Sequence, residues 1–166
     1  MIDPKYKPGK TQRELVRIWV TAIEESARDF FPHPGEFCRR VYENAASNLV
    51  NVICNEYGYH MKPAGTIKEA VEAYIELAIK SGLFEDTRQF VLKEVNPNKI
   101  EVSVFNCVYL PCCQDILDKG SVISELTCPR LGCFAGVAGI TTDIACSHTL
   151  TDFNPGKCCQ GFIERI

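Results

Sequence analysis

The spacing of the apolar residues changes at about Thr87, and this change constrains the fold more than any other feature of the chain. Before that point, apolar side chains recur every three to four residues, the period of an amphipathic helix. After it, "RQFVLKEV" and "KIEVSVFNCVYL" flank the turn signal "NPN" and predict a β-hairpin. Long N-terminal helices packed with a small, mainly antiparallel sheet predict an α+β fold.

Three helices are predicted before the hairpin. The first two are "TQRELVRIWVTAIEESARDFF" and "EFCRRVYENAASNLVNVICNEYG", and the third begins at Thr66, which forms a T-x-x-E capping box with Glu69. The apolar stripes expected to face the core are Leu15, Trp19, Ile23, Ala27 and Phe30 in the first helix, and Phe37, Val41, Ala45, Leu49, Val52 and Ile53 in the second.

The C-terminal third predicts two more helices and two more strands. "CCQDILDKG" is a short helix, and "SELTCPRLGCFAGVAGITT" is a longer one with Pro129 in its first turn. Gly132, Gly136 and Gly139 would let that helix approach another element closely. "IACSHTLTDF" and "CCQGFIERI" are strand candidates separated by the turn "NPGK".

Composition and charge narrow the class of protein. The 166 residues fit a single domain, 1–166, with a helical half (1–84) and a hairpin plus cysteine-rich half (85–166). A formal net charge of −3 gives no basic surplus for binding nucleic acid. No apolar run is long enough for a membrane span, and "MIDPKYKPGKTQREL" has no apolar signal core, so we expect a cytoplasmic protein.

Ten cysteines are hard to assign to disulfides in a reducing compartment. Eight of them lie between Cys107 and Cys159, so the thiol chemistry belongs to the cysteine-rich C-terminal third. This pattern leaves three interpretations open: metal binding, redox or catalytic thiols without metal, and simple core packing.

The spacing favours some thiols as metal ligands. Cys128 precedes Pro129 at a helix N-terminus, which favours the thiolate, whereas Cys133 would point away from it on the same helix. Cys107 closes the predicted strand, and one cysteine of each adjacent pair is expected at the site. The candidate ligands are Cys107, Cys112, Cys113, Cys128, Cys158 and Cys159. Four thiolates suit zinc or an iron–sulfur cluster, and three with an open position would allow catalysis.

Other residues extend this site. Cys128 is the candidate nucleophile, with Asp143 or His148 as the base. Tyr109, Phe134 and Gly136 are the candidates for lining an apolar cofactor or ligand pocket, together with Phe84 and Phe90.

The order of these elements, closing on "TLTDFNPGKCCQGFIE", resembles the vinyl-4-reductase domain superfamily, and within it the L-2-amino-thiazoline-4-carboxylic acid hydrolase-like proteins. The matching residues are Cys107 with Tyr109, Cys128, Asp143, Thr149 with Leu150, Gly156, and the last cysteine with Phe162. The resemblance covers roughly residues 85–166 and implies a domain related to the trafficking-complex TRAPP subunits. Such domains bind hydrophobic or tetrapyrrole-like ligands and carry C-terminal cysteines that can hold metal.

Three functions follow as hypotheses. The first is a binding or accessory domain with a cysteine-bound metal or iron–sulfur cluster beside a pocket for a small apolar molecule. The second is a metal- or thiol-dependent hydrolase of a small C–N substrate such as L-2-amino-thiazoline-4-carboxylate. The third is an iron–sulfur subunit of a larger redox complex; a homodimer is the other assembly that we expect.

Overall fold

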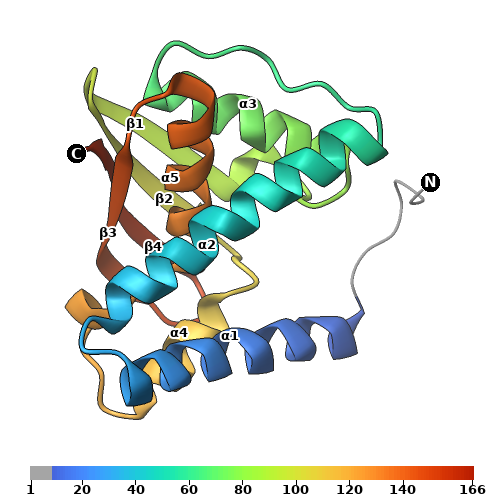
Figure 1. Cartoon of the computed structure of the whole chain (residues 1–166). Coiled ribbons are helices and arrows are strands. Elements are labelled where there is room, and N and C mark those ends of the chain that lie inside the picture. The colour runs from blue at the N-terminus through green and yellow to red at the C-terminus, as the bar shows by residue number, and fades with distance from the viewer. Residues whose placement is uncertain (1–8) are drawn as a thin grey trace.

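The computed structural model describes residues 9–166 (Figure 1). Residues 1–8 lie outside the described residues. They form the first part of the segment "MIDPKYKPGKTQREL", to which the prediction on a signal core refers. The helices are α1 (Lys10–Phe30), α2 (Pro34–Asn51), which continues as a π-helical turn (Val52–Glu56), α3 (Ile67–Lys80), α4 (Leu110–Asp118) and α5 (Pro129–Thr142). Short 3-10 turns lie at Thr87–Gln89 and Ile123–Glu125. The strands are β1 (Phe90–Asn96), β2 (Lys99–Phe105), β3 (Cys146–Asn154) and β4 (Cys158–Arg165).

The four strands form one antiparallel sheet in the order β1-β2-β4-β3. In β2, Ile100, Val102 and Val104 are buried while their neighbours are half-exposed, the alternation that the sequence predicts. The "NPGK" turn joins β3 to β4, and Gly156 takes a φ of 68° there, a conformation that glycine adopts without strain. The expected α+β fold is confirmed.

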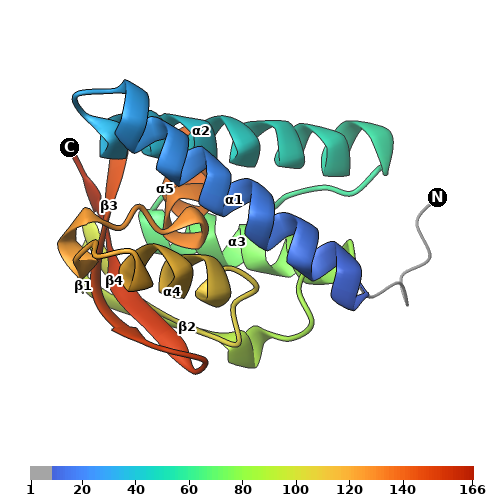
Figure 2. The same ribbon diagram turned by 90° about the horizontal axis from the view of Figure 1, so that it is seen from below.

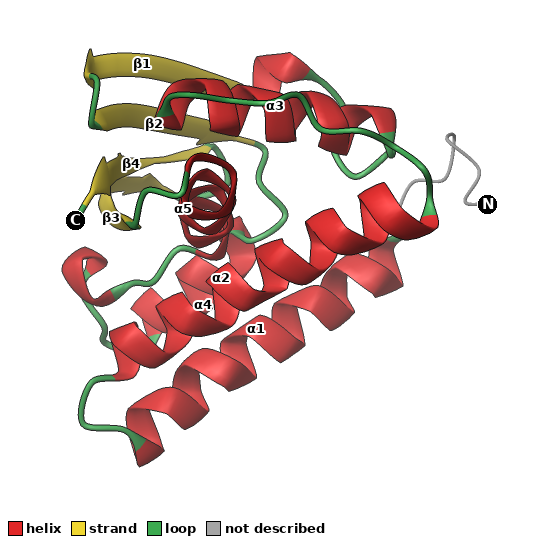
Figure 3. Ribbon diagram, turned by 45° about the horizontal axis from the view of Figure 1, so that its top comes forward, coloured by secondary structure: helices red, strands yellow, loops and turns green. Residues whose placement is uncertain are grey.

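The helices cover one face of the sheet in successive layers (Figure 3). Helix α5 packs on β3 and β4, and α3 packs beside it on β2. Helix α2 covers α5, and α1 is outermost, packed between α2 and α4 (Figure 2). None of the helices in the described part of the chain is long and apolar enough to cross a membrane.

Glycines bring α5 against α2. A Cβ added at Gly132 would lie 2.9 Å from Cβ of Tyr42, and one added at Gly136 would lie 2.9 Å from Cα of Glu43. Side chains at these two positions would push the helices apart, so the predicted close approach is confirmed there. At Gly139 the nearest atom would be a carbonyl oxygen at 3.5 Å, an ordinary contact.

The expected core face of α1 is only partly correct. Ala27 is fully buried and Ile23 packs against the core, whereas Trp19 is 63% exposed and Leu15 and Phe30 are also exposed. Glu24, outside the expected stripe, is only 3% exposed. Polar partners on the neighbouring helices explain the rotation. The Tyr42 hydroxyl donates a hydrogen bond of 2.6 Å to Glu24, and Arg17 forms two contacts of 2.6 Å with Asp115 of α4. Hydrogen bonds between buried polar groups therefore set the face of this helix.

The first half of the expected α2 stripe is displaced by one residue. Cys38, Tyr42 and Ala46 are buried there, whereas Phe37 is exposed. Further along, Ile53 in the π-helical turn is buried as expected. The glycines of α5 explain the displacement. Gly132 and Gly136 lie directly against Tyr42 and the backbone of Glu43, so this part of α2 faces α5.

Strand β2 ends before the expected position. Asn106 takes a φ of 50°, which ends the extended conformation, so Cys107 lies two residues beyond the strand instead of closing it. The change of direction carries the chain from the sheet into α4.

Candidate functional site

An aromatic pocket of about 840 Å³ opens between the N-terminal half of α1 and the core of the domain. Phe84, Phe90 and Tyr109, three of the residues predicted to line such a pocket, lie in its wall. Leu49 of α2 and Val104 of β2 add aliphatic surface. We call this hollow the aromatic pocket.

Arg130 of α5 lies in the wall of the aromatic pocket. The residue is only 7% exposed, and its guanidinium carbon lies 4.4 Å from the ring centre of Phe84 and 5.1 Å from that of Tyr109. Both rings present their negative faces to the cation. Arginine stays charged in proteins, so the pocket contains a buried positive charge held by aromatic rings.

Two polar atoms at this place are buried without a hydrogen-bond partner among residues 9–166. They are Nε of Arg130 and the hydroxyl of Tyr74, a fully buried residue of α3 that also lines the aromatic pocket. Buried polar groups without partners are uncommon, because each costs desolvation free energy. Both atoms belong to residues that line the aromatic pocket.

Cys107 is the predicted site cysteine that lines the aromatic pocket. Its thiol contacts the guanidinium of Arg130; burial raises the pKa of the thiol, and the positive charge of Arg130 opposes that shift. Cys107 is therefore held as a neutral thiol near neutral pH.

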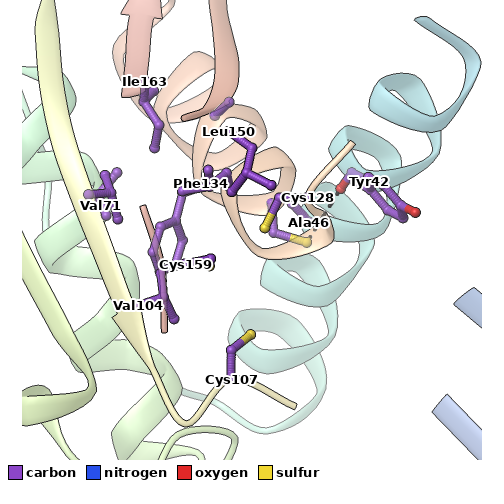
Figure 4. Packing of buried hydrophobic residues seen from close by; sticks show 14 of the residues in the cluster. Tyr42, Ala46, Val71, Val104, Cys107, Cys128, Phe134, Leu150, Cys159 and Ile163 are labelled. Carbon is purple, nitrogen blue, oxygen red and sulfur yellow. Dashed lines mark hydrogen bonds between the residues drawn. The ribbon is translucent and has the colours of Figure 1, made fainter. Parts of the chain in front are cut away.

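A second group of thiols lies on the other side of the first turn of α5. The Cys128 thiol is hydrogen bonded to the thiols of Cys113 from α4 and Cys159 from β4. Figure 4 shows Cys128 and Cys159 within the packed core, beside Phe134 and Leu150. We call Cys113, Cys128 and Cys159 the thiol cluster. It holds one cysteine from each adjacent pair, whereas Cys112 and Cys158 lie outside the main apolar core.

One sulfur of the thiol cluster is set apart electrostatically. Hydrogen bonds from the thiols of Cys113 and Cys159 lower the pKa of Cys128 well below its usual value, and the amide of Leu131 adds to the effect against the cost of burial. The same contacts raise the pKa of Cys113 and of Cys159. The cluster therefore favours a single negative charge, on the sulfur at the N-terminus of α5.

The thiol cluster has the donor chemistry of a soft metal site but not its geometry. Three thiols match the ligands that zinc and iron–sulfur clusters use. Yet among residues 9–166 no three His, Cys, Asp or Glu side chains are grouped so that they could hold a metal ion. All ten cysteines are free.

The remaining predicted residues are dispersed. His148 of β3 lies close enough to Cys128 for each to shift the pKa of the other, and burial lowers the pKa of the imidazole. Asp143 caps the far end of α5, exposed, with a φ of 55°. Phe134 lies behind the aromatic pocket, in edge contact with the rings of its wall, and Gly136 packs against α2.

Arg130 and Tyr74 are the residues that sequence reasoning missed. A signal for the first was present, because Arg130 is the single charged residue in the otherwise apolar, glycine-rich segment "CPRLGCFAGVAG". A charge inside a buried helix needs a partner or a function. Tyr74 gives no comparable signal, since its position on the helical stripe is that of an ordinary core residue.

Searches against protein-family models, curated proteins and solved structures find no match to this chain.

Proposed function

We propose that the chain is a small-molecule-binding domain of the vinyl-4-reductase type, which takes a hydrophobic or tetrapyrrole-like ligand into the aromatic pocket. The observation that carries this proposal is a pocket of about 840 Å³ with Phe84, Phe90 and Tyr109 in its wall. Ligand sites in proteins are typically concave, apolar and of this size, with a few polar groups that orient the ligand. Arg130 and Tyr74 supply such groups here.

A neutral fluorescent probe tests the pocket directly. N-phenyl-1-naphthylamine should bind with a blue-shifted, enhanced emission at a stoichiometry of one. Leu49→Trp should weaken this binding by more than about tenfold, because a larger ring fills the aromatic pocket. Leu15→Trp, the same exchange on the exposed face of α1, should leave it unchanged. Failure of the probe to bind the wild-type protein, or equal binding by a folded Leu49→Trp variant, would overturn the proposal.

A metal or cluster site is the second candidate, favoured by the thiol cluster, in which Cys128 contacts both Cys113 and Cys159. If zinc or an iron–sulfur cluster belongs there, protein purified without oxygen will contain about one zinc, or iron with sulfide and broad visible absorption. Cys128→Ala should then lose it. Protein that is colourless and free of zinc would exclude both the metal-binding function and a cluster-carrying subunit of a redox complex.

The hydrolase alternative depends on Cys128 as nucleophile. The lowered pKa of Cys128 favours this role, but the residue is only 1% exposed. It lines neither the aromatic pocket nor a second, more polar hollow whose wall includes His148. Turnover of L-2-amino-thiazoline-4-carboxylate that disappears in a folded Cys128→Ser variant would support it.

Localisation and assembly complete the proposal. Ten free cysteines suit a reducing, cytoplasmic compartment. A homodimer remains the simplest assembly, and sedimentation of the purified chain tests it.

A further inference from the structure

Arg130 differs from the other charged residues that line the aromatic pocket. Arg17 contacts Glu14 at 3.4 Å and Asp115 at 2.6 Å, and Arg13 contacts Glu85 at 3.9 Å. All of these lie near the mouth, on partly exposed side chains. Arg130 takes part in none of the ion pairs formed within residues 9–166. The one deeply buried charge of the pocket therefore has no opposite charge.

An unpaired buried guanidinium is costly to the fold. The faces of Phe84 and Tyr109 and the thiol of Cys107 offset part of that cost, but Nε has no hydrogen-bond acceptor in the described part of the chain. Two carboxylates line the pocket, Glu14 and Glu85, but within the described residues they pair with Arg17 and Arg13 and form no ion pair with Arg130. An anionic ligand would supply both the missing charge and the missing acceptor.

The hydroxyl of Tyr74 marks the same place. Its pKa is raised above the usual value, chiefly by burial, and the charge of Arg130 acts on it in the opposite direction, so the two groups are close. The neutral hydroxyl can donate one hydrogen bond, and none of the described residues accepts it. Arg130 and Tyr74 therefore offer donors to one bound group.

The geometry of the donors selects the anion. A guanidinium presents two parallel N–H groups, which match the two oxygens of a carboxylate. One buried cation compensates one negative charge, so a monoanion fits the site better than a dianionic phosphate. The aromatic and aliphatic walls require that the rest of the ligand be apolar.

From these observations we infer that the aromatic pocket binds small apolar monocarboxylic acids, with the carboxylate on Arg130 and the hydroxyl of Tyr74. This inference rests on the proposed function and specifies its ligand class. Arg130 is then a ligand-binding residue, and the aromatic rings around it bind the apolar body of the acid.

Two probes of nearly the same shape test the inference. Naphthalene-1-acetate carries the carboxylate, and naphthalene-1-acetamide carries a neutral amide in its place. Each is titrated against the protein loaded with N-phenyl-1-naphthylamine at pH 7. We expect the acid to displace the neutral probe at about a tenfold lower concentration than the amide, because hydrogen bonds between charged partners are the stronger ones.

Variants assign the preference to the two donors. Arg130→Met should bind the acid and the amide equally. Arg130→Lys should recover only part of the preference, since an ammonium group lacks the bidentate fork. Tyr74→Phe should weaken acid binding by about fivefold. Arg40→Met is the control, because Arg40 is exposed and lines neither the aromatic pocket nor the hollow beside His148. This exchange should leave the preference for the acid over the amide unchanged.

The outcomes separate this inference from the proposed function. If the neutral probe binds and the wild-type protein shows no preference for the acid, the carboxylate assignment is wrong. The proposed binding of small apolar molecules in the pocket is then retained. If the neutral probe does not bind at all, the proposed function itself fails. The wild-type comparison needs no variant, so misfolding of Arg130→Met leaves the test intact.

Discussion

Cys128 and Arg130 stand two residues apart at the start of α5, and the surroundings of the two side chains are opposite in kind. Cys128 enters the thiol cluster, where neighbouring sulfurs complete its hydrogen bonds. Arg130 enters the aromatic pocket, where its charge has no counterion and its Nε no acceptor within the described residues. The thiol cluster resembles a finished core, whereas the aromatic pocket leaves a buried charge without a counterion among the described residues. A buried polar group therefore points to function when its neighbours leave it unsatisfied.

The largest predicted effect concerns the wall behind the aromatic pocket. Phe134 is fully buried and meets Tyr74, Phe90 and Phe84 at ring distances of 5.9, 5.6 and 6.4 Å. Phe134→Ala should lower the free energy of unfolding by about 3–5 kcal/mol, because it leaves a large cavity. Urea denaturation measures this loss.

Phe31→Ala is the matched control for this exchange. Phe31 is partly exposed and stacks on Phe37 at the surface, so Phe31→Ala should lower the free energy of unfolding far less than Phe134→Ala. A loss below about 1 kcal/mol in Phe134→Ala would contradict the rigid wall on which the pocket depends.

The second prediction tests whether the thiol cluster and the aromatic pocket are independent. Cys128→Ala should lower the free energy of unfolding by about 1–2 kcal/mol, since it removes a buried sulfur and leaves two thiol donors without their acceptor. Affinity for the neutral probe should not change, because Cys128 does not line the pocket. Cys54→Ala, in the π-helical turn, is the control. Parallel losses of stability and probe binding would show that the two regions act as one site.

The third and smallest predicted effect is a pH dependence of the free energy of unfolding, caused by the buried carboxyl of Glu24. Burial raises the pKa of Glu24, while Tyr42, Arg28 and Cys38 act in the opposite direction. Between its ordinary value of 4.5 and the raised value, the folded state binds more protons than the unfolded state. Stability should therefore fall as the pH rises through this window. Glu24→Gln should remove that fall.

Denaturation of the wild-type protein and the Glu24→Gln variant between pH 4 and 8 measures the difference. Other carboxylates, such as Asp115 with its lowered pKa beside Arg17, act alike in both proteins and cancel. Equal slopes in the two proteins would mean that Glu24 titrates as an ordinary exposed acid.

Local signals made most of the elements predictable. The capping box of Thr66 and Glu69 starts α3, Pro129 starts α5, and the alternation of β2 defines its buried face. Each of these depends on neighbours a few residues away, and a sequence displays such neighbours directly.

The faces of α1 and α2 were not predictable in the same way. The periodicity of α1 is strong, yet Leu15, Trp19 and Phe30 of its apolar stripe face solvent. Glu24 and Arg17 instead find partners on α2 and α4. A helical period gives the existence of a face, and the partner elements decide which face is buried.

By itself, the sequence determined the α+β class, the order of the elements, and the concentration of thiols around the start of α5. Only the tertiary structure decided that Cys113 and Cys159, and not their neighbours, meet Cys128. It also decided that Arg130 packs against aromatic rings and pairs with no carboxylate of the described residues. The physical reason is that satisfaction of a buried polar group depends on contacts between residues distant in the chain. Composition and spacing carry no record of which of those contacts are missing.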